Sequence, residues 1–216
     1  MMNWKQLISA KRFGMEEFHE ERQENRSEFQ RDYDRLIFSA PFRRLQNKTQ
    51  VFPLPGSVFV HNRLTHSLEV ASVGRSLGDD VAKALLERHP ELQDSFLPEI
   101  GSIVSAACLA HDLGNPPFGH SGEKAISTFF SEGKGVRLKE KQPNGEQLSP
   151  MEWEDLTHFE GNANAFRILT HQFEGRRKGG FVLTYTTLAS IVKYPFSSSL
   201  AAVSYTHLRA HETELH

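Results

Sequence analysis

The stretch from Ile100 to Pro117 constrains the fold more than any other part of the chain, because a buried helical face runs directly into two polar side chains. Apolar or small residues recur there at intervals of three and four, which predicts an amphipathic helix facing a core. They are Ile100, Ile103, Val104, Ala107 and Cys108. His111 continues this stripe, so its imidazole points inward and needs a hydrogen-bond partner or a metal ion. Asp112 follows at once, and a buried aspartate is normally paired or coordinated.

A glycine and two prolines end this helix just past the histidine and aspartate. Gly114 and the Pro116-Pro117 pair place both side chains at a helix terminus, where a pocket can open. Two interpretations of the pair remain open, a metal site and a hydrogen-bonded structural pair. A single His-Asp pair at a helix end is more often a hydrogen-bonded structural pair than a metal site.

Two further regions supply groups of the same chemical kind. His66 lies in a second amphipathic pattern, a helix predicted from about residue 63 to 88, whose inward face is marked by Leu64, Leu68, Ala71, Leu77 and Val81. His120 and Glu123 share one helical face if a helix starts near Ser121 as its N-cap. Three histidines and two carboxylates from neighbouring helices suffice for a metal and its acid/base groups. An acidic residue in a first turn, however, also stabilises a helix whatever its function.

Composition excludes several classes of protein. The 216 residues, 38% of them hydrophobic, suit one globular domain, and the single cysteine excludes an internal disulfide framework. No apolar run is long enough to span a membrane and the polar start lacks a secretory core, so we expect no membrane partner and a cytoplasmic location. With a net charge of -2, any polyanion must be met by a local basic patch. One basic run is a candidate for this patch or an ordinary solvated surface: Arg31, Arg35, Arg43, Arg44 and Lys48.

Four longer strings occur in a defined order: RDYDRLIFSAPFRRLQNKTQV, HNRLTHSLEVA, HDLGNPPFGHSGE and HFEGNANAFRIL. Together they resemble the bacterial deoxynucleoside triphosphate triphosphohydrolases, the dGTPase family of HD-domain proteins, over roughly residues 25–195. The resemblance implies an all-α fold, an HD-domain helical bundle. At most a small β-hairpin is expected near residues 51–60, where two prolines and a glycine exclude a regular helix.

Composition and the same resemblance together divide the chain into three parts. Residues 1–26 are an N-terminal arm with a short helix, and residues 27–196 are the HD domain, with an exposed loop insertion at 131–149 that ends where Ser149, Pro150 and Glu152 signal a helix start. Residues 197–216 carry no family block, and we interpret them as a non-native tail on a chain truncated at its C-terminus. The family's continuation would supply one more aspartate to the metal site, whereas the last aspartate here is Asp155.

The resemblance also assigns roles to individual residues. It implies that His66, His111 and Asp112 hold a divalent ion, and Mn²⁺ or Mg²⁺ suits a site with a carboxylate and no thiolate. His120 is implied as the general acid/base and Glu123 as the group that orients it or the attacking water. The implied substrate contacts are Gln50 near the sugar 3′-hydroxyl, Val51 against the sugar, Arg63 and His158 on the phosphates, and Asn162 in the EGNA turn.

The predicted function is therefore metal-dependent hydrolysis of a deoxynucleoside triphosphate, with dGTP the favoured substrate, to the deoxynucleoside and inorganic triphosphate. Family members commonly assemble, so a homo-oligomer is expected of the full-length parent. Two alternatives stay open: another HD phosphohydrolase, either a nucleotidase or a phosphodiesterase, and a non-catalytic regulator that binds nucleotides or single-stranded DNA. A chain that lacks one metal ligand could bind without turning over.

Overall fold

A computed structural model describes residues 3–17, 26–49, 62–142, 145, 147–175 and 178–193. Within these ranges the chain is helical, and extended pairing is limited to two isolated antiparallel bridges, Arg12 with Thr184 and Thr49 with Asn62. The predicted all-α class is confirmed, whereas the predicted hairpin near residues 51–60 and the tail at 197–216 lie outside the described residues.

The α-helices are α1 (Trp4–Leu7), α2 (Glu28–Ile37), α3 (Ala40–Arg44), α4 (Arg63–Arg88), α5 (Ile100–Ala110), α6 (His120–Ser131), α7 (Pro150–Thr157), α8 (Gly161–Thr170) and α9 (Tyr185–Ile191). Short 3₁₀ helices span Leu45–Asn47, Pro90–Leu92, Leu97–Glu99 and Lys134–Lys139.

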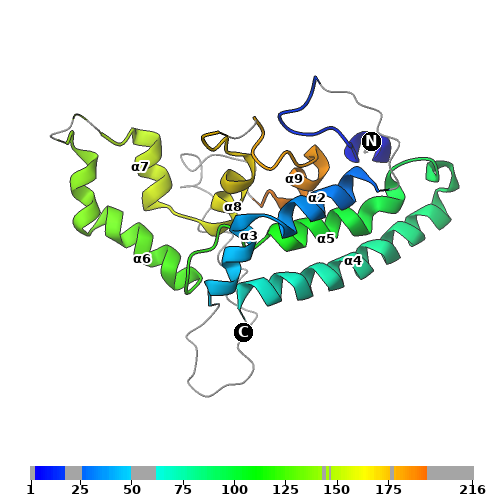
Figure 1. Ribbon diagram of the computed structural model, residues 1–216, viewed down its shortest axis with the longest axis horizontal. Coiled ribbons are helices and arrows are strands. Elements are labelled where there is room, and N and C mark those ends of the chain that lie inside the picture. Colours follow the sequence, from blue (N-terminus) through cyan, green and yellow to red (C-terminus); the bar gives the residue numbers. More distant parts are fainter. Residues whose placement is uncertain are drawn as a thin grey trace, which may run out of the picture.

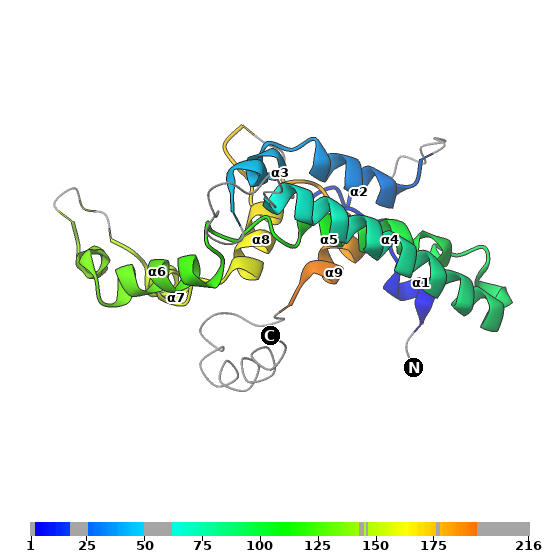
Figure 2. The same cartoon turned by 90° about the horizontal axis from the view of Figure 1, so that it is seen from below.

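Helix α5 is the centre of the bundle. It contacts α2, α4 and α9, and Figures 1 and 2 show the long α4 running beside it. Seven of its eleven residues are buried, but only Ile103 of the predicted stripe is among them. Ile100, Val104, Ala107 and Cys108 are half-buried, so the most deeply buried side of α5 is not the one that was predicted. It contributes Ala106, Leu109 and Ala110 to the core, and the apolar residues buried around it include Leu36, Phe42, Leu45, Ala71, Leu113, Ala165, Leu169, Leu183 and Leu188. A helix covered on several sides holds a rigid position, which fixes the chain that follows it.

Small residues set the distance between α4 and α5. A Cβ atom on Gly78 would lie 2.7 Å from the Cα atom of Gly101, and one on Gly74 would lie 2.7 Å from the Cys108 sulfur. The Ser105 hydroxyl donates a hydrogen bond across the contact to the carbonyl oxygen of Ala71, at 3.0 Å. The two backbones therefore approach more closely than larger side chains would permit.

The buried face of α4 differs from the one predicted. Leu77 and Val81 were expected to face inward, but they are 61% and 51% exposed. The face turned to α5 instead carries small residues, namely Ser67, Ala71, Gly74, Gly78 and Ala82. Two helices that pack closely require small side chains at their contact. The spacing of apolar residues in a sequence does not show where such small residues are needed.

The N-terminal segment is tied into the same body. The Arg12 guanidinium donates to the Asp32 carboxylate at 2.7 Å and to the carbonyl oxygen of Val182. Asp32 is fully buried, and its second oxygen accepts from the amide and hydroxyl of Thr184. Residues 3–17, predicted as part of an arm, thus pack on α2 and the start of α9 of their own chain.

Helices α6 and α7 extend to one side of the bundle (Figure 1). They contact each other, and the 3₁₀ helix Lys134–Lys139 packs on α6 within the segment predicted as a loop insertion. The predicted start of α7 is present as a capping box, in which Ser149 and Glu152 cap each other's backbone amides. Of the helices in the described ranges, none has both the length and the apolarity needed to cross a bilayer.

Replacement of Gly78 by alanine tests the close helix contact. The added methyl group would meet the backbone of Gly101, which cannot rotate away, so we expect the free energy of unfolding to fall by about 1–3 kcal/mol. This loss is expected even though alanine favours a helix by about 1 kcal/mol over glycine. Urea denaturation measures it. The matched control is Ser72→Ala on the exposed side of α4, with an expected change within about 0.5 kcal/mol; a stabilised Gly78→Ala variant would contradict the contact.

Candidate metal centre

Three predicted metal ligands meet where the start of α4 faces the end of α5. His66 lies in the first turns of α4, whose N-cap Asn62 accepts a hydrogen bond from the amide of Thr65. His111 is the C-cap of α5 and Asp112 follows it. One potential ligand atom from each of the three side chains lies within 4.8 Å of the other two, and the two imidazole centroids are 5.3 Å apart. Within the described ranges, no other histidine, cysteine or carboxylate joins this metal triad of His66, His111 and Asp112.

The hydrogen bonding of His111 leaves one ring nitrogen available. Its Nδ1 lies 2.6 Å from the carbonyl oxygen of Cys108, and a carbonyl only accepts, so Nδ1 carries the proton. Nε2 then keeps its lone pair, and it lies 3.5 Å from an Asp112 oxygen. A backbone carbonyl that fixes the tautomer in this way is a common partner of metal-binding histidines.

The Asp112 carboxylate is 4% exposed and only half satisfied. Its Oδ1 accepts from the Arg63 guanidinium at 2.9 Å and from the side-chain amide of Asn115. Its Oδ2 is buried and has no hydrogen-bond partner among the described residues. A buried carboxylate oxygen without a donor is costly, and a cation would satisfy it. One oxygen and two imidazole nitrogens therefore fit a divalent ion, which is a property of the donor set itself.

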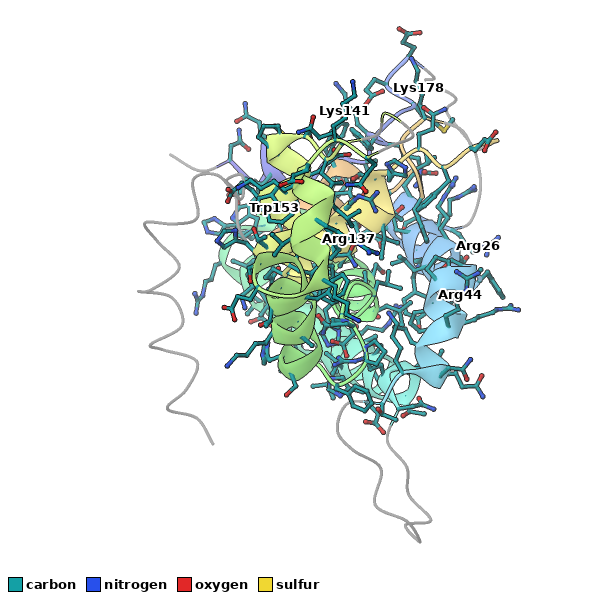
Figure 3. The ribbon with its side chains drawn as sticks, turned by 90° about the vertical axis from the view of Figure 1, so that its left-hand side faces the viewer. Arg26, Arg44, Arg137, Lys141, Trp153 and Lys178 are labelled. Atoms are coloured by element: carbon teal, nitrogen blue, oxygen red, sulfur yellow. The ribbon has the colours of Figure 1, made fainter. Side chains whose placement is uncertain are left out.

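Lys48 also lies at the site, although the sequence placed it only in a basic run that was either an anion-binding patch or a solvated surface. Its ammonium donates to the carbonyl oxygen of Asn115 at 2.9 Å, and its own carbonyl oxygen accepts from the amide of Arg63 at 3.1 Å. Burial lowers the pKa of Lys48, and the Arg63 charge lowers it further while Asp112 opposes the shift. Arg43 and Arg44, by contrast, are exposed, and Figure 3 shows Arg44 at the outer edge. Lys48 of the basic run is thus hydrogen-bonded to the turn that follows the metal triad.

His120 and Glu123 form a second pair, on the first turn of α6. The Nδ1 atom of His120 lies 2.7 Å from Oε2 of Glu123, and the other carboxylate oxygen accepts from the amide of Gly161 at 2.8 Å. Glu123 is buried, while the His120 side chain is 86% exposed. Ser121 was predicted as the N-cap, but α6 begins at His120 after Gly119, whose φ of 55° suits a glycine.

Among the described residues, two further predicted site residues, His158 and Asn162, make no hydrogen bond or ion pair with the metal triad. His158 caps the C-terminus of α7, where its Nδ1 lies 3.1 Å from the carbonyl oxygen of Glu154. The Asn162 amide donates to the side chain of Glu160, the N-cap of α8. Gln50 and Val51 lie outside the described residues. A shallow groove beside Asp79, Lys83 and Glu87 lies toward the other end of α4, away from His66.

This arrangement of residues lies within the range of the chain that matches a known protein family. The family model for the HD domain matches residues 63–194, more than half of the chain. The chain belongs to the HD domain family. The matched range contains every residue of the metal triad and of the His120–Glu123 pair, and it falls inside the domain predicted at 27–196.

Curated relatives of this HD domain chain carry informative names. A deoxyguanosinetriphosphate triphosphohydrolase-like protein of Synechocystis is 50% identical over 197 residues, and one of Pseudomonas aeruginosa is 48% identical over 201. A deoxyguanosinetriphosphate triphosphohydrolase of Yersinia enterocolitica is 38% identical over 219 residues. These matches cover 89–91% of this chain but 41–43% of each relative. The chain thus spans less than half the length of the proteins it matches.

The Arg63–Asp112 ion pair yields a stability prediction. Replacing Arg63 by methionine would leave a buried carboxylate uncompensated, so we expect the free energy of unfolding to fall by about 3–5 kcal/mol. The double variant Arg63→Met/Asp112→Leu removes both charges and should lose less than the single variant. Thermal and urea unfolding measure both losses.

The matched control for this pair is on the surface. Arg26 and Asp34 approach to 2.8 Å but are 64% and 37% exposed, and Figure 3 shows Arg26 at the outer surface. Arg26→Met should cost about 1 kcal/mol or less. Equal losses for Arg63→Met and Arg26→Met would contradict a buried, energetically coupled pair.

Proposed function

We propose that the protein is a metal-dependent phosphohydrolase that cleaves deoxynucleoside triphosphates, with dGTP as the favoured substrate, to the deoxynucleoside and inorganic triphosphate. One observation carries the proposal: His66, His111 and Asp112 converge, and a buried oxygen of Asp112 accepts no hydrogen bond from the described part of the chain. The names of the similar proteins from Synechocystis and Yersinia enterocolitica support the choice of substrate.

The metal triad would hold Mn²⁺ or Mg²⁺ through the free Nε2 of His111, a ring nitrogen of His66 and Oδ2 of Asp112. When bound, such an ion supplies Lewis-acid activation of a phosphate group. A fourth ligand, the aspartate that the family resemblance implies, would come from the full-length parent. Arg63 would hold Oδ1 of Asp112 in place, so that Oδ2 stays directed to the ion.

The phosphates would be bound by positively charged side chains at the same place. Arg63 uses one amino group for Asp112, and its buried Nε donates to no group of the described residues, so donors remain for a phosphate oxygen. We assign His158 and Asn162 to the outer phosphate contacts and Gln50 and Val51 to the sugar, as the family resemblance implies. Binding phosphate would offset the positive charge that Arg63 and Lys48 bring to the site.

His120 would transfer the proton. Its Nδ1–H is held by Glu123, which leaves Nε2 on the exposed side of the ring, free to accept a proton or to donate one when the ring is charged. Glu123 is a positioning residue, because both of its oxygens already accept hydrogen bonds. Homo-oligomer assembly of the full-length parent and a cytoplasmic location belong to the same proposal.

Mn²⁺ binding tests the metal triad in this chain. We expect His66→Ala to weaken Mn²⁺ binding by about tenfold or more, because one of three protein ligands is lost. Electron paramagnetic resonance of free Mn²⁺ measures the affinity. His89→Ala, at the exposed C-cap of the same helix, is the matched control and should bind as the wild type does. Equal affinities of the His66→Ala variant and the wild type would remove the proposed site.

Product analysis tests the reaction in the full-length parent. With dGTP and Mn²⁺ we expect inorganic triphosphate and deoxyguanosine in equal amounts. Gln50→Ala should lower turnover by about tenfold or more with little change in thermal stability, because a site built around a substrate hydroxyl discriminates by hydrogen bonds. Release of orthophosphate or pyrophosphate would instead indicate another HD phosphohydrolase. Nucleotide binding with no product would indicate a regulator.

A further inference from the structure

The turn after the metal triad is held by one asparagine. The Asn115 side-chain amide donates to Oδ1 of Asp112, and the Asn115 carbonyl oxygen accepts from the Lys48 ammonium at 2.9 Å. Asn115 is thus fixed by its side chain and by its backbone. Because its amide occupies Oδ1, the unpartnered Oδ2 remains the oxygen that is open to a cation.

The first residue of α8 lies against this asparagine. A Cβ atom on Gly161 would be 1.8 Å from Oδ1 of Asn115 and 2.9 Å from Oε1 of Glu123. The Gly161 amide also donates to that Glu123 oxygen at 2.8 Å. Gly161 therefore contacts one residue that holds Asp112 and another that holds His120, and only a residue without a side chain fits between them.

A second contact docks α8 on the same turn. The Asn164 side-chain amide donates to the carbonyl oxygen of Gly114 at 2.9 Å. A Cβ atom on Gly114 would lie 2.1 Å from the carbonyl oxygen of Gly161 and from the amide nitrogen of Ala165. The start of α8 and the turn at residues 114–115 are thus in backbone contact, so a displacement of either moves the other.

We propose that Asn115 and Gly161 are positioning residues that couple the metal triad to the His120–Glu123 pair. The EGNA segment then serves as a backbone brace between two groups of side chains, in addition to any contact with substrate. The metal half of this inference rests on the proposed function, whereas the His120 half does not. The brace fixes Asp112 through Asn115 and Glu123 through the Gly161 amide.

Gly161→Ala is the decisive variant, because Gly161 contacts neither the metal triad nor His120 in the hydrogen bonds above. Alanine is the better helix former, so helix stability alone predicts no damage. The brace instead predicts two changes: about tenfold or greater loss of Mn²⁺ affinity, and a change in which His120 ring nitrogen carries the proton, read from imidazole ¹⁵N shifts. His120→Gln assigns the resonance.

Two further variants complete the test. Asn115→Ala should weaken Mn²⁺ binding by about 10–100-fold, as is usual for a residue that orients a metal ligand. Asn47→Ala, on an exposed residue of the 3₁₀ helix Leu45–Asn47, is the matched control and should alter neither reading. If Gly161→Ala alone does not fold, the double variant with Asn115→Ala removes the worst clash and is compared with Asn115→Ala. The His120 ¹⁵N shifts alone are then the deciding reading, because the contact from Gly161 to Asp112 through Asn115 is absent from both variants.

The brace is overturned if folded Gly161→Ala changes neither reading, or changes one of the two without the other. A wild-type chain that fails to bind Mn²⁺ refutes the metal triad of the proposed function. In that case the His120 ¹⁵N shifts still show whether Gly161 positions the His120–Glu123 pair. Unchanged shifts in the Gly161→Ala variant would then overturn the inference.

Discussion

The rest of the structure depends on the close approach of α4 and α5. A Cβ atom on Gly78 would meet the backbone of Gly101, and a Cβ atom on Gly74 would meet the side-chain sulfur of Cys108. His66 lies about two helical turns before Gly74, and His111 lies about one turn after Cys108. With the helix separation and register fixed in this way, the two imidazoles and the Asp112 carboxylate meet at one end of the contact, and the metal triad follows from packing rather than from a flexible loop.

The second constraint is charge. The buried Asp112 carboxylate is faced by Arg63. Burial lowers the pKa of the nearby Lys48, and the charge of Arg63 lowers it further, while Asp112 opposes the shift. A divalent ion at Oδ2 would add more positive charge to this region. In the proposed function the phosphates of the substrate compensate that charge, so metal and substrate should support each other's binding. Asn115 contributes a neutral donor, which holds Asp112 without adding to the repulsion.

The sequence predicted helices and chemical types better than it predicted contacts. The spacing around Ile103 predicted a helix at α5, and Ser149 with Glu152 predicted the start of α7, because both signals are local. Leu77 and Val81 were wrongly placed inside, since apolar periodicity cannot distinguish a large side chain from the glycines that the α5 contact requires. Lys48 and Gly161 were missed for a related reason: their partners are 67 and 38 residues away in sequence, and no local pattern reports them.

The helix contact can be measured directly through the single native cysteine. A Cβ atom at position 74 would lie 3.6 Å from the Cβ atom of Cys108, within the range of a disulfide. Burial raises the pKa of the Cys108 thiol, which slows its oxidation by partners that are not held against it. Under mild oxidant, Gly74→Cys should form an intramolecular disulfide with Cys108, seen by mass spectrometry, while Ser72→Cys on the exposed face should not. Free thiols in folded Gly74→Cys, or equal cross-linking in both variants, would contradict the arrangement of α4 and α5 that brings His66 to His111.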